Sequence, residues 1–258
     1  MSMLKEQTYV SWTCYLCDDF SSDDSLALLH QASSLDDRIV VISSPSLNRN
    51  LGPAVIRNHL LQFSSAPYIS FCDIDDLWHP QKLYLQLQFH ISHNLQLSVT
   101  SYSRFVSNKC GSCRILGSST PPESLTYQTL LRTNSIPMLC TIINRDCLKV
   151  RFPNIKHEDY SLWLRLFSSK TPPRYGCLKL PLAYYRVHSE NLTSNKAKMA
   201  FWVYAVFRSV GHSRRHSVVM TLIWSVHKIP SIIDGALSIF SSKTYPSQTL
   251  MMQLLRER

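Results

Sequence analysis

The chain has 258 residues, of which 45% are hydrophobic and 17% are charged. This length and composition allow a large buried core and exclude a disordered tail. The formal net charge of +10 predicts an anionic partner. Charge alone does not decide between nucleic acid, a phosphate-bearing substrate and an acidic membrane face.

The eight cysteines are scattered along the chain, and the first residues, MSMLKEQ, include no apolar signal segment. Both features favour the reducing cytoplasm. Two CxxC pairs, Cys14/Cys17 and Cys110/Cys113, make a zinc site an alternative. The first pair lies in a strand-like run whose residues three apart face opposite ways, and the second has no partner pair nearby. Incidental or buried thiols are therefore the favoured interpretation.

Short β-rich runs alternate with helical patterns over the first hundred residues. Strands are predicted over Trp12–Cys17, Arg38–Ile42 and Tyr68–Cys72, and helices are predicted to open near 22–24, at 52–53 and at Pro80. This β-α-β-α order predicts a mostly parallel sheet covered by helices on both faces. Ligands of such sheets bind beyond the carboxyl ends of the strands.

The pattern is more mixed from residue 96 onward. Strands are predicted over Gln96–Ser101, Met138–Asn144 and Leu182–Val187, with a Gly-, Ser- and Pro-rich loop at 111–124 and a helix over Asp159–Phe167. Long helical stretches follow Asn195. The simplest organisation is one domain over 1–195 followed by a basic, aromatic-rich helical tail over 196–258.

An acidic motif, YISFCDIDDLW at 68–78, follows the third predicted strand. Asp73 and Asp75 are two residues apart in an extended chain, so their side chains point the same way. Such a carboxylate pair beside a diphosphate is typical of a Mg²⁺ or Mn²⁺ site, where the metal offsets the charge of a departing diphosphate. Capping of the next helix is the alternative, but capping needs only one acid.

Four further positions carry candidate chemistry. Asp18 and Asp19 follow the first strand and could accept hydrogen bonds from a base or a ribose hydroxyl. Arg57 lies just after the start of a helix and could contact a nucleotide or diphosphate. Asp159 begins an amphipathic helix, where a helix cap is the alternative. His188 follows a strand and has three alternative roles, as a metal ligand, a base or a structural histidine.

The order of these motifs resembles bacterial family 2 glycosyltransferases that build surface polysaccharides such as lipopolysaccharide. The resemblance runs from about Gln7 to Lys198. The matching segments are QTY at 7–9, DDFSSDDS at 18–25, GPAVIRN at 52–58, FCDIDDLWHPQKL at 71–83, EDYSLWLRL at 158–166 and YYRVHSENLTSNK at 184–196. The resemblance implies an α/β domain of the GT-A type, with a nucleotide-binding half at 1–100 and an acceptor half at 101–195.

The resemblance also assigns the donor side of the site. Asp18 and Asp19 would hold the base and ribose of a nucleotide-sugar donor, expected to be a UDP-sugar. Arg57 would lie near the nucleotide. Asp73 and Asp75 would bind the diphosphate and a Mn²⁺ or Mg²⁺ ion.

On the acceptor side, the resemblance makes Asp159 the general base that deprotonates the hydroxyl of a glycan or lipid-linked acceptor. Glu158 would assist acceptor binding, and His188 would be a further metal ligand. A single displacement that inverts the anomeric centre needs one carboxylate on the acceptor side and a metal on the leaving side.

The beginning of the chain departs from this family's pattern. Members open with a strand and a helix that ends in a QT-like turn, and here Met1 stands just before that turn at Gln7. The sequence therefore predicts a GT-A domain without its first strand, and an inactive remnant of the same fold is the alternative.

Two other function classes are weaker alternatives. A haloacid-dehalogenase-type phosphatase also has a strand followed by DxD, with Asp73 as the nucleophile. That motif ordinarily has Thr or Val at the place of Asp76, and it leaves the ED motif unexplained. A basic nucleic-acid-binding module would match the charge, but no recognition motif is visible, so no nucleic-acid partner is expected.

Residues from Lys196 onward mix basic and aromatic side chains, as an interfacial helix does. Val218–Ile233 is the nearest approach to the stretch of about 18 apolar residues that spans a bilayer, and polar residues interrupt it. We therefore expect a cytoplasmic enzyme held peripherally on an anionic membrane. The alternative, left open, is that these aromatics pack on the catalytic domain.

Overall fold

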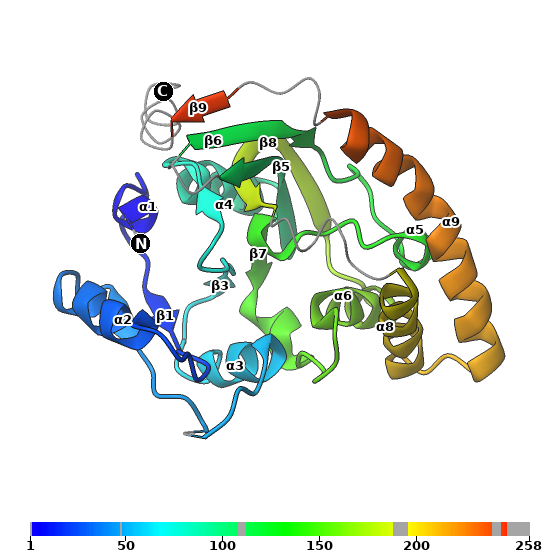
Figure 1. The fold of residues 1–258 in the computed structure, drawn as a ribbon, viewed down its shortest axis with the longest axis horizontal. Helices are drawn as coiled ribbons and strands as arrows, with labels where there is room; N and C mark the ends of the chain where they lie inside the picture. Colours follow the sequence, from blue (N-terminus) through cyan, green and yellow to red (C-terminus); the bar gives the residue numbers. More distant parts are fainter. Residues whose placement is uncertain (1, 47, 108–111, 188–195, 239–243, 247–258) are drawn as a thin grey trace.

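The computed structural model describes residues 2–46, 48–107, 112–187, 196–238 and 244–246, and it consists of two sheets surrounded by helices (Figure 1). The helices are α1 (Ser2–Lys5), α2 (Ser25–Ser34), α3 (Pro53–Leu60), α4 (Lys82–Ser92), α5 (Tyr127–Arg132), α6 (Glu158–Phe167), α8 (Lys196–Ser209) and α9 (Arg214–Ser238), with 3-10 turns η1 (Met138–Cys140) and η2 (Arg145–Lys149). The strands are β1 (Cys14–Leu16), β2 (Ile39–Val41), β3 (Tyr68–Ile69), β4 (Leu77–Trp78), β5 (Leu97–Ser107), β6 (Ser112–Ser119), β7 (Thr141–Asn144), β8 (Tyr175–Arg186) and β9 (Thr244–Pro246).

The pairing of the strands differs from the predicted mostly parallel sheet. β1 and β2 pair in parallel as a separate two-stranded sheet. In the larger sheet, ordered β3-β7-β5-β6-β9 with β8 alongside β5 and β4, the β5–β8 pairing is parallel and the other described pairings are antiparallel. The prediction of parallel pairing is right for the first sheet and wrong for the second, where β5 and β6 form a hairpin and the other antiparallel partners are strands far apart in the sequence.

Strand β5 is the centre of the larger sheet. Its first residues are buried, and it pairs with β7 at its start, β6 at its end and β8 along its length. β6 occupies most of the predicted 111–124 loop. Gly117 at φ 130° and a register shift between Arg104 and Phe105 interrupt its pairing. These irregularities weaken the alternation that would identify a strand in the sequence.

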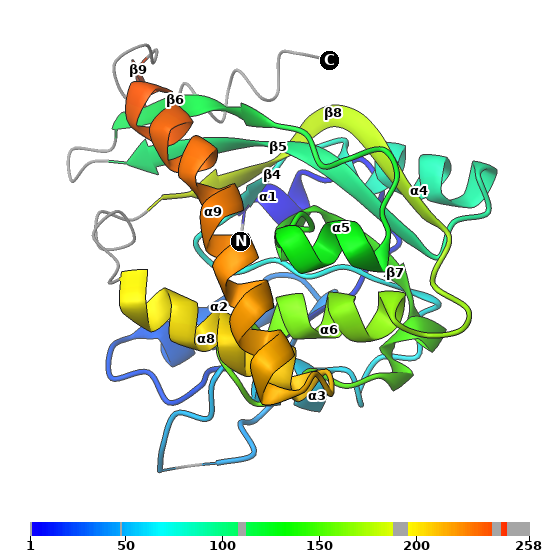
Figure 2. The same cartoon turned by 90° about the vertical axis from the view of Figure 1, so that its right-hand side faces the viewer.

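Much of the hydrophobic core lies between the larger sheet and helices α6, α8 and α9, and Figure 2 shows α9 crossing in front of α6 and α8 on the face turned to the viewer. Leu162, Trp163 and Leu164 on α6 are fully buried, and the Trp163 indole donates to the carbonyl of Ile136 at 3.1 Å. Phe207 on α8 is also fully buried in this core. This packing fixes α6, and with it the acidic residues of its first turn.

The QT-like turn near the start of the chain is part of the buried structure. The Gln7 side chain donates to the carbonyl of His79 at 2.9 Å and accepts from the amide of Leu83 at 3.1 Å. Because these bonds span more than seventy residues, they hold the first segment against the start of α4.

Lys82, at the start of α4, is completely buried. Its ammonium donates to the side-chain oxygen of Gln86 at 2.9 Å and lies 4.1 Å from the ring centre of Trp78. No carboxylate forms an ion pair with it among the described residues. Burial lowers the pKa of Lys82 from 10.5 to about 8, because the charged form loses its hydration.

This lysine gives a pH-dependent prediction for stability. Because the pKa is lowered in the folded state, the unfolded chain binds more protons than the folded chain between pH 8 and 10.5. The Lys82 contribution therefore raises the free energy of unfolding, and so stabilises the fold, as pH rises through that range. At about 1.4 kcal/mol per pKa unit, the change is on the order of 3 kcal/mol. Urea unfolding of the wild type and of Lys82→Met at pH 7.5, 9 and 10 measures it. A wild-type-minus-variant difference that stays constant across this range would contradict the prediction.

Helices α8 and α9 contribute one face to the core and leave another in solvent. Val203, Val206 and Trp224 are buried in the core cluster that also contains α6, whereas Phe201 and Leu222 are exposed. Of the tail aromatics, Trp224 therefore packs on the catalytic domain, as one interpretation of the sequence expects, whereas Phe201 stays exposed, as the membrane interpretation requires. No helix in the described part of the chain combines the length and apolar character needed to cross a bilayer.

Candidate active site

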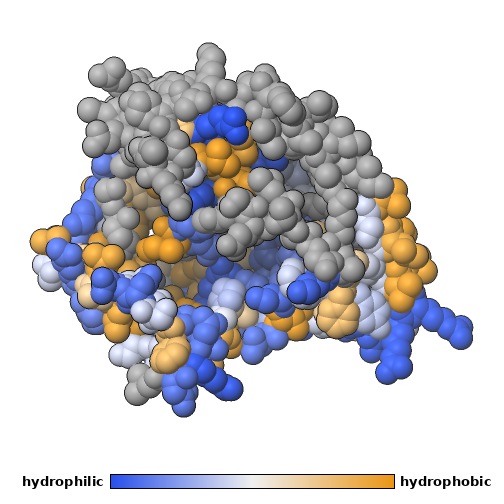
Figure 3. Space-filling model, in the orientation of Figure 1, coloured by the Kyte–Doolittle hydropathy of each residue, from blue (hydrophilic) through white to orange (hydrophobic). Residues whose placement is uncertain are grey.

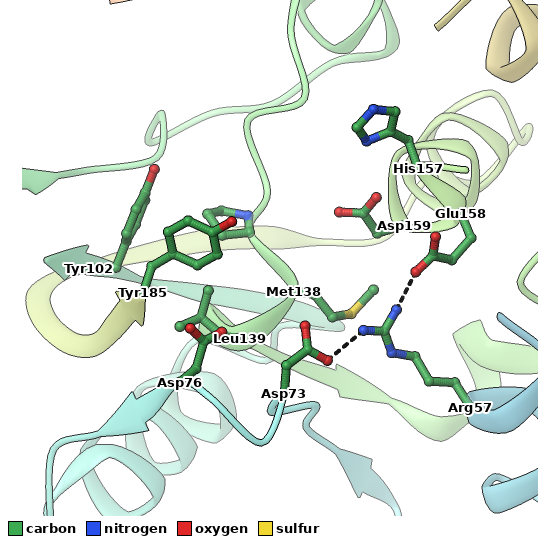
Figure 4. Close-up of a pocket in the computed structure, with 11 residues that line it drawn as sticks. Arg57, Asp73, Asp76, Tyr102, Met138, Leu139, His157, Glu158, Asp159 and Tyr185 are labelled. Atoms are coloured by element: carbon green, nitrogen blue, oxygen red, sulfur yellow. Dashed lines mark hydrogen bonds and ion pairs between the residues drawn. The ribbon is translucent and has the colours of Figure 1, made fainter. Parts of the chain in front are cut away.

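A cavity of about 290 Å³ lies between the loop that follows β3 and the first turn of α6 (Figure 4). Residues from both halves of the chain enclose it. They are Arg57, Asp73, Asp76, Tyr102, Pro137, Met138, Leu139, His157, Glu158, Asp159 and Tyr185. The structure thus brings Arg57, Asp73, Glu158 and Asp159, which the sequence placed in one site, around one cavity.

Arg57 connects the two acidic groups. Its guanidinium donates to the Asp73 carboxylate at 2.7 Å and to the Glu158 carboxylate at 2.5 Å, as the dashed lines in Figure 4 show. Burial alone would lower the pKa of Arg57, but the two carboxylates outweigh it and raise that pKa above its usual value. A planar guanidinium suits such a double contact because its N–H groups diverge in a fixed fork.

The acidic loop after β3 is held by the end of β8. The buried Asp76 carboxylate accepts from the amide of Arg186 at 2.9 Å, and the Arg186 guanidinium donates to the carbonyl of Asp75 at 2.8 Å. Burial raises the pKa of Asp76 to about 7 despite the amide bond. Helix α4 begins only at Lys82, after Gln81. The acids of this loop are therefore not its cap, and the capping alternative does not apply.

Asp159 lies in the first turn of α6 and faces the cavity (Figure 4). One carboxylate oxygen accepts from the amide of Tyr160 at 2.7 Å, and the other accepts from the side-chain amide of Asn134 at 3.2 Å. The residue at the cap position is His157, so Asp159 is not the helix cap. The buried Glu158 beside it is paired with Arg57.

Asp18 and Asp19 lie apart from this cavity. The Asp19 carboxylate accepts from the backbone amides of Leu51 at 2.8 Å and Gly52 at 2.7 Å, and Asp18 accepts from the amide of Ser21 at 2.9 Å. Gly52 has φ 86°, a left-handed conformation that glycine adopts without strain. In this structure Asp19 therefore fixes the loop from which α3 carries Arg57 towards the cavity.

The site offers carboxylates to the expected divalent ion. Mg²⁺ and similar ions are often held by one or two carboxylates, with substrate phosphates completing the shell. Asp73 fits this role because its side chain is 57% exposed at the cavity; Asp75 is two residues away but does not line the cavity. No group of three or more His, Cys, Asp or Glu among the described residues is arranged to hold an ion. His188 and Cys110, which the sequence singled out, lie outside the described residues.

Several residues of this site were not predicted from the sequence, among them four with polar side chains that bear on its chemistry. Asn134 donates to the Asp159 carboxylate, His157 lines the cavity, and the contact between Asp76 and Arg186 holds the acidic loop. Asp76 is the third acid of the DxDD motif and Arg186 is the arginine of YYRVH, so the sequence did contain a signal for these two. Nothing local in the sequence distinguished Asn134.

Comparisons with known proteins place the chain in a family. The family described as glycosyl transferase family 2 matches residues 2–148, more than half of the chain. A relative named putative teichuronic acid biosynthesis glycosyltransferase TuaG, from Bacillus subtilis, is 32% identical over 207 residues, covering 80% of this chain and 79% of that protein. The Escherichia coli protein WfgD, named a UDP-Glc:alpha-D-GlcNAc-diphosphoundecaprenol beta-1,3-glucosyltransferase, is 30% identical over 199 residues, covering 77% and 74%.

Solved structures share the fold at low identity. TarS residues 1–349 from Staphylococcus aureus, in complex with UDP, align with a TM-score of 0.59 and 17% identity over 89% of this chain and 66% of that chain. The mannosyltransferase PcManGT from Pyrobaculum calidifontis, in complex with GDP-Man and Mn²⁺, aligns with a TM-score of 0.56 and 12% identity, covering 98% and 73%. The GT-A type prediction is confirmed, and this chain belongs to glycosyl transferase family 2.

Proposed function

We propose that this glycosyltransferase moves a sugar from a UDP-sugar to a hydroxyl of a glycan or lipid-linked acceptor, with inversion at the anomeric carbon. One observation carries the proposal. The Asp73 and Asp159 carboxylates, from opposite halves of the chain, line the same cavity with Arg57 and Glu158 between them. A single displacement requires a residue that binds the donor and a base for the acceptor hydroxyl on two sides of one cavity.

The donor side is assigned to residues 1–100. Asp73 and Asp75 would hold Mn²⁺ or Mg²⁺ with the diphosphate, and the ion would offset the negative charge of the leaving group. Asp18 and Asp19 are proposed for the base and ribose. The Asp19 carboxylate already accepts two backbone amides, so it would have to use its remaining acceptor capacity for the nucleotide.

The acceptor side is assigned to residues 101–195. Asp159 takes the proton of the acceptor hydroxyl as its oxygen attacks the anomeric carbon from the face opposite the diphosphate. The bond to the diphosphate breaks with its electron pair, and the configuration inverts. Asn134 and the Tyr160 amide hold the Asp159 carboxylate in place, while Glu158 is engaged with Arg57. Asp159 is therefore the better placed of the two for proton transfer.

A direct test uses UDP-glucose, Mn²⁺ and a synthetic GlcNAc-diphospho-lipid, the acceptor class in the name of the WfgD relative. Mass spectrometry should detect one added hexose and released UDP, and a panel of other UDP-sugars and lipid-linked glycans extends the assay. If the protein binds UDP but transfers no sugar to any member of the panel, the result contradicts the proposed function and favours the inactive alternative.

We also propose that α9 holds the enzyme on an anionic membrane. Val218, Leu222 and Val226 follow one another at intervals of four residues, which places them on one helix face, and each is about half exposed or more. Arg214 and Arg215 precede this apolar stripe. Figure 3 shows hydrophobic residues along the edge that α9 forms, with hydrophilic residues at its lower end. Apolar residues beside basic ones are typical of interfacial helices.

The stripe predicts a specific effect on membrane binding. Leu222→Asp should weaken sedimentation with phosphatidylglycerol vesicles about tenfold at low salt, because it replaces an inserted apolar side chain with a charge that anionic lipid repels. Ile91→Asp, on an exposed position of α4, is the matched control and should sediment like the wild type. Equal sedimentation of Leu222→Asp and the wild type would show that the stripe is not the contact.

A further inference from the structure

His157 has an unusual backbone conformation at the edge of the cavity. It has φ 57° and ψ 45°, the left-handed region that non-glycine residues rarely adopt. Its ring lines the cavity and packs edge-on against Trp202 of α8, with ring centres 5.8 Å apart. Backbone strain of this kind gathers at active sites, where a side chain must be held in one place.

Two polar atoms near Asp159 have no hydrogen-bond partner in the described part of the chain. They are Nε2 of His157 and the side-chain oxygen of Asn134, and both are buried. Buried polar atoms are nearly always hydrogen-bonded, so each exception calls for a reason. Asn134 does not itself line the cavity, but its side-chain nitrogen donates to Asp159, which does, and this leaves its oxygen as an acceptor beside the proposed base.

We propose that His157 and Asn134 form the acceptor subsite next to Asp159 and bind hydroxyl groups of the accepting sugar. The inference rests on the proposed function and names the part of the acceptor that enters the cavity. A sugar hydroxyl can donate to the Asn134 oxygen and can either donate to or accept from the imidazole.

The charges beside Asp159 favour a hydroxyl over a phosphate at this subsite. An anion has no proton for the Asn134 oxygen, and Glu158 and Asp159 would repel it at this place. Arg57, the cation of the cavity wall, is already shared by two carboxylates. If the acceptor is lipid-linked through a diphosphate, that diphosphate therefore lies outside this subsite.

His157→Gly is the informative variant because glycine adopts the left-handed conformation freely, so the backbone is kept while the imidazole is lost. Asn134→Ala removes the amide, and Asn94→Gly, another left-handed residue, on an exposed turn after α4, is the matched control. Each protein is assayed with UDP-glucose and the synthetic GlcNAc-diphospho-lipid, and UDP affinity and the thermal midpoint are measured in parallel.

For His157→Gly and Asn134→Ala we expect the acceptor KM to rise at least tenfold, with UDP affinity within threefold of the wild type. His157→Gly should also keep the wild-type thermal midpoint, and Asn94→Gly should match the wild type in every assay. An unchanged acceptor KM in both His157→Gly and Asn134→Ala, with wild-type transfer intact, would overturn the subsite alone. A loss of acceptor affinity that only follows a lowered thermal midpoint would also overturn it. A wild type that binds no UDP would overturn the proposed function as well.

Discussion

Replacing Asp159 with asparagine is expected to lower the transfer rate by about 10²–10⁴-fold, the usual contribution of a positioned acid–base group. Asparagine has nearly the same shape, and its one side-chain oxygen can accept from one of the two donors, Asn134 or the Tyr160 amide, so the first turn of α6 should keep its geometry. UDP affinity and thermal stability should therefore stay close to those of the wild type. Initial rates with UDP-glucose and the synthetic acceptor, together with calorimetry for UDP, measure both quantities.

Asp146→Asn is the control for this substitution. Asp146 is an acid at the surface, 85% exposed and paired with Lys149 on η2, away from the cavity. It should transfer at the wild-type rate. If Asp159→Asn also kept that rate, Asp159 would not be the base, and its role would be limited to its contacts with Asn134 and the Tyr160 amide.

Replacing Asp73 or Asp75 with alanine is expected to weaken UDP binding in the presence of Mn²⁺ by about ten- to a hundredfold. A charge-assisted contact is worth roughly 1.5–3 kcal/mol, and each 1.4 kcal/mol is about tenfold in affinity. The wild type should bind UDP more tightly with Mn²⁺ or Mg²⁺ than with EDTA, whereas the variants should lose most of that difference. Calorimetric titration of UDP under the two conditions measures it.

The metal site is reported by the difference in UDP affinity between Mn²⁺ and EDTA, rather than by the affinity itself. Asp73→Ala also removes one of the two partners of Arg57, so some loss could come from a displaced arginine. Asp75→Ala keeps both carboxylate partners of Arg57, Asp73 and Glu158, so this variant separates the two effects. Equal UDP affinity with Mn²⁺ and with EDTA, in the wild type and in both variants, would contradict the metal site.

The local elements were largely predictable because their signals are local. The strand before the DxDD motif, the proline at the start of α3 and the amphipathic spacing of α6 each indicated an element that the structure contains. Strand pairing was not predictable in the same way. Whether a strand pairs in parallel depends on where the chain returns, and the antiparallel pairings of β5 and β7 leave no local trace.

The site shows the same division between local and long-range information. Asp73 and Asp159 follow recognisable patterns, but the bond from Arg57 to Glu158 joins residues 101 positions apart, and no spacing rule connects them. Asn134 lies in a segment without a distinctive pattern, and its contact with Asp159 exists only in the folded chain. The strained backbone of His157 also cannot be read from its residue type, because histidine rarely adopts that conformation.

The configuration of the newly formed glycosidic bond tests the central claim most directly. A single displacement with Asp159 as the base converts an α-linked UDP-glucose into a β-linked product. The one-bond and three-bond couplings of the anomeric proton in the purified product, measured by NMR, distinguish the two configurations. We predict a β-linked glucose. An α-linked product would contradict the single-displacement account and the role given to Asp159.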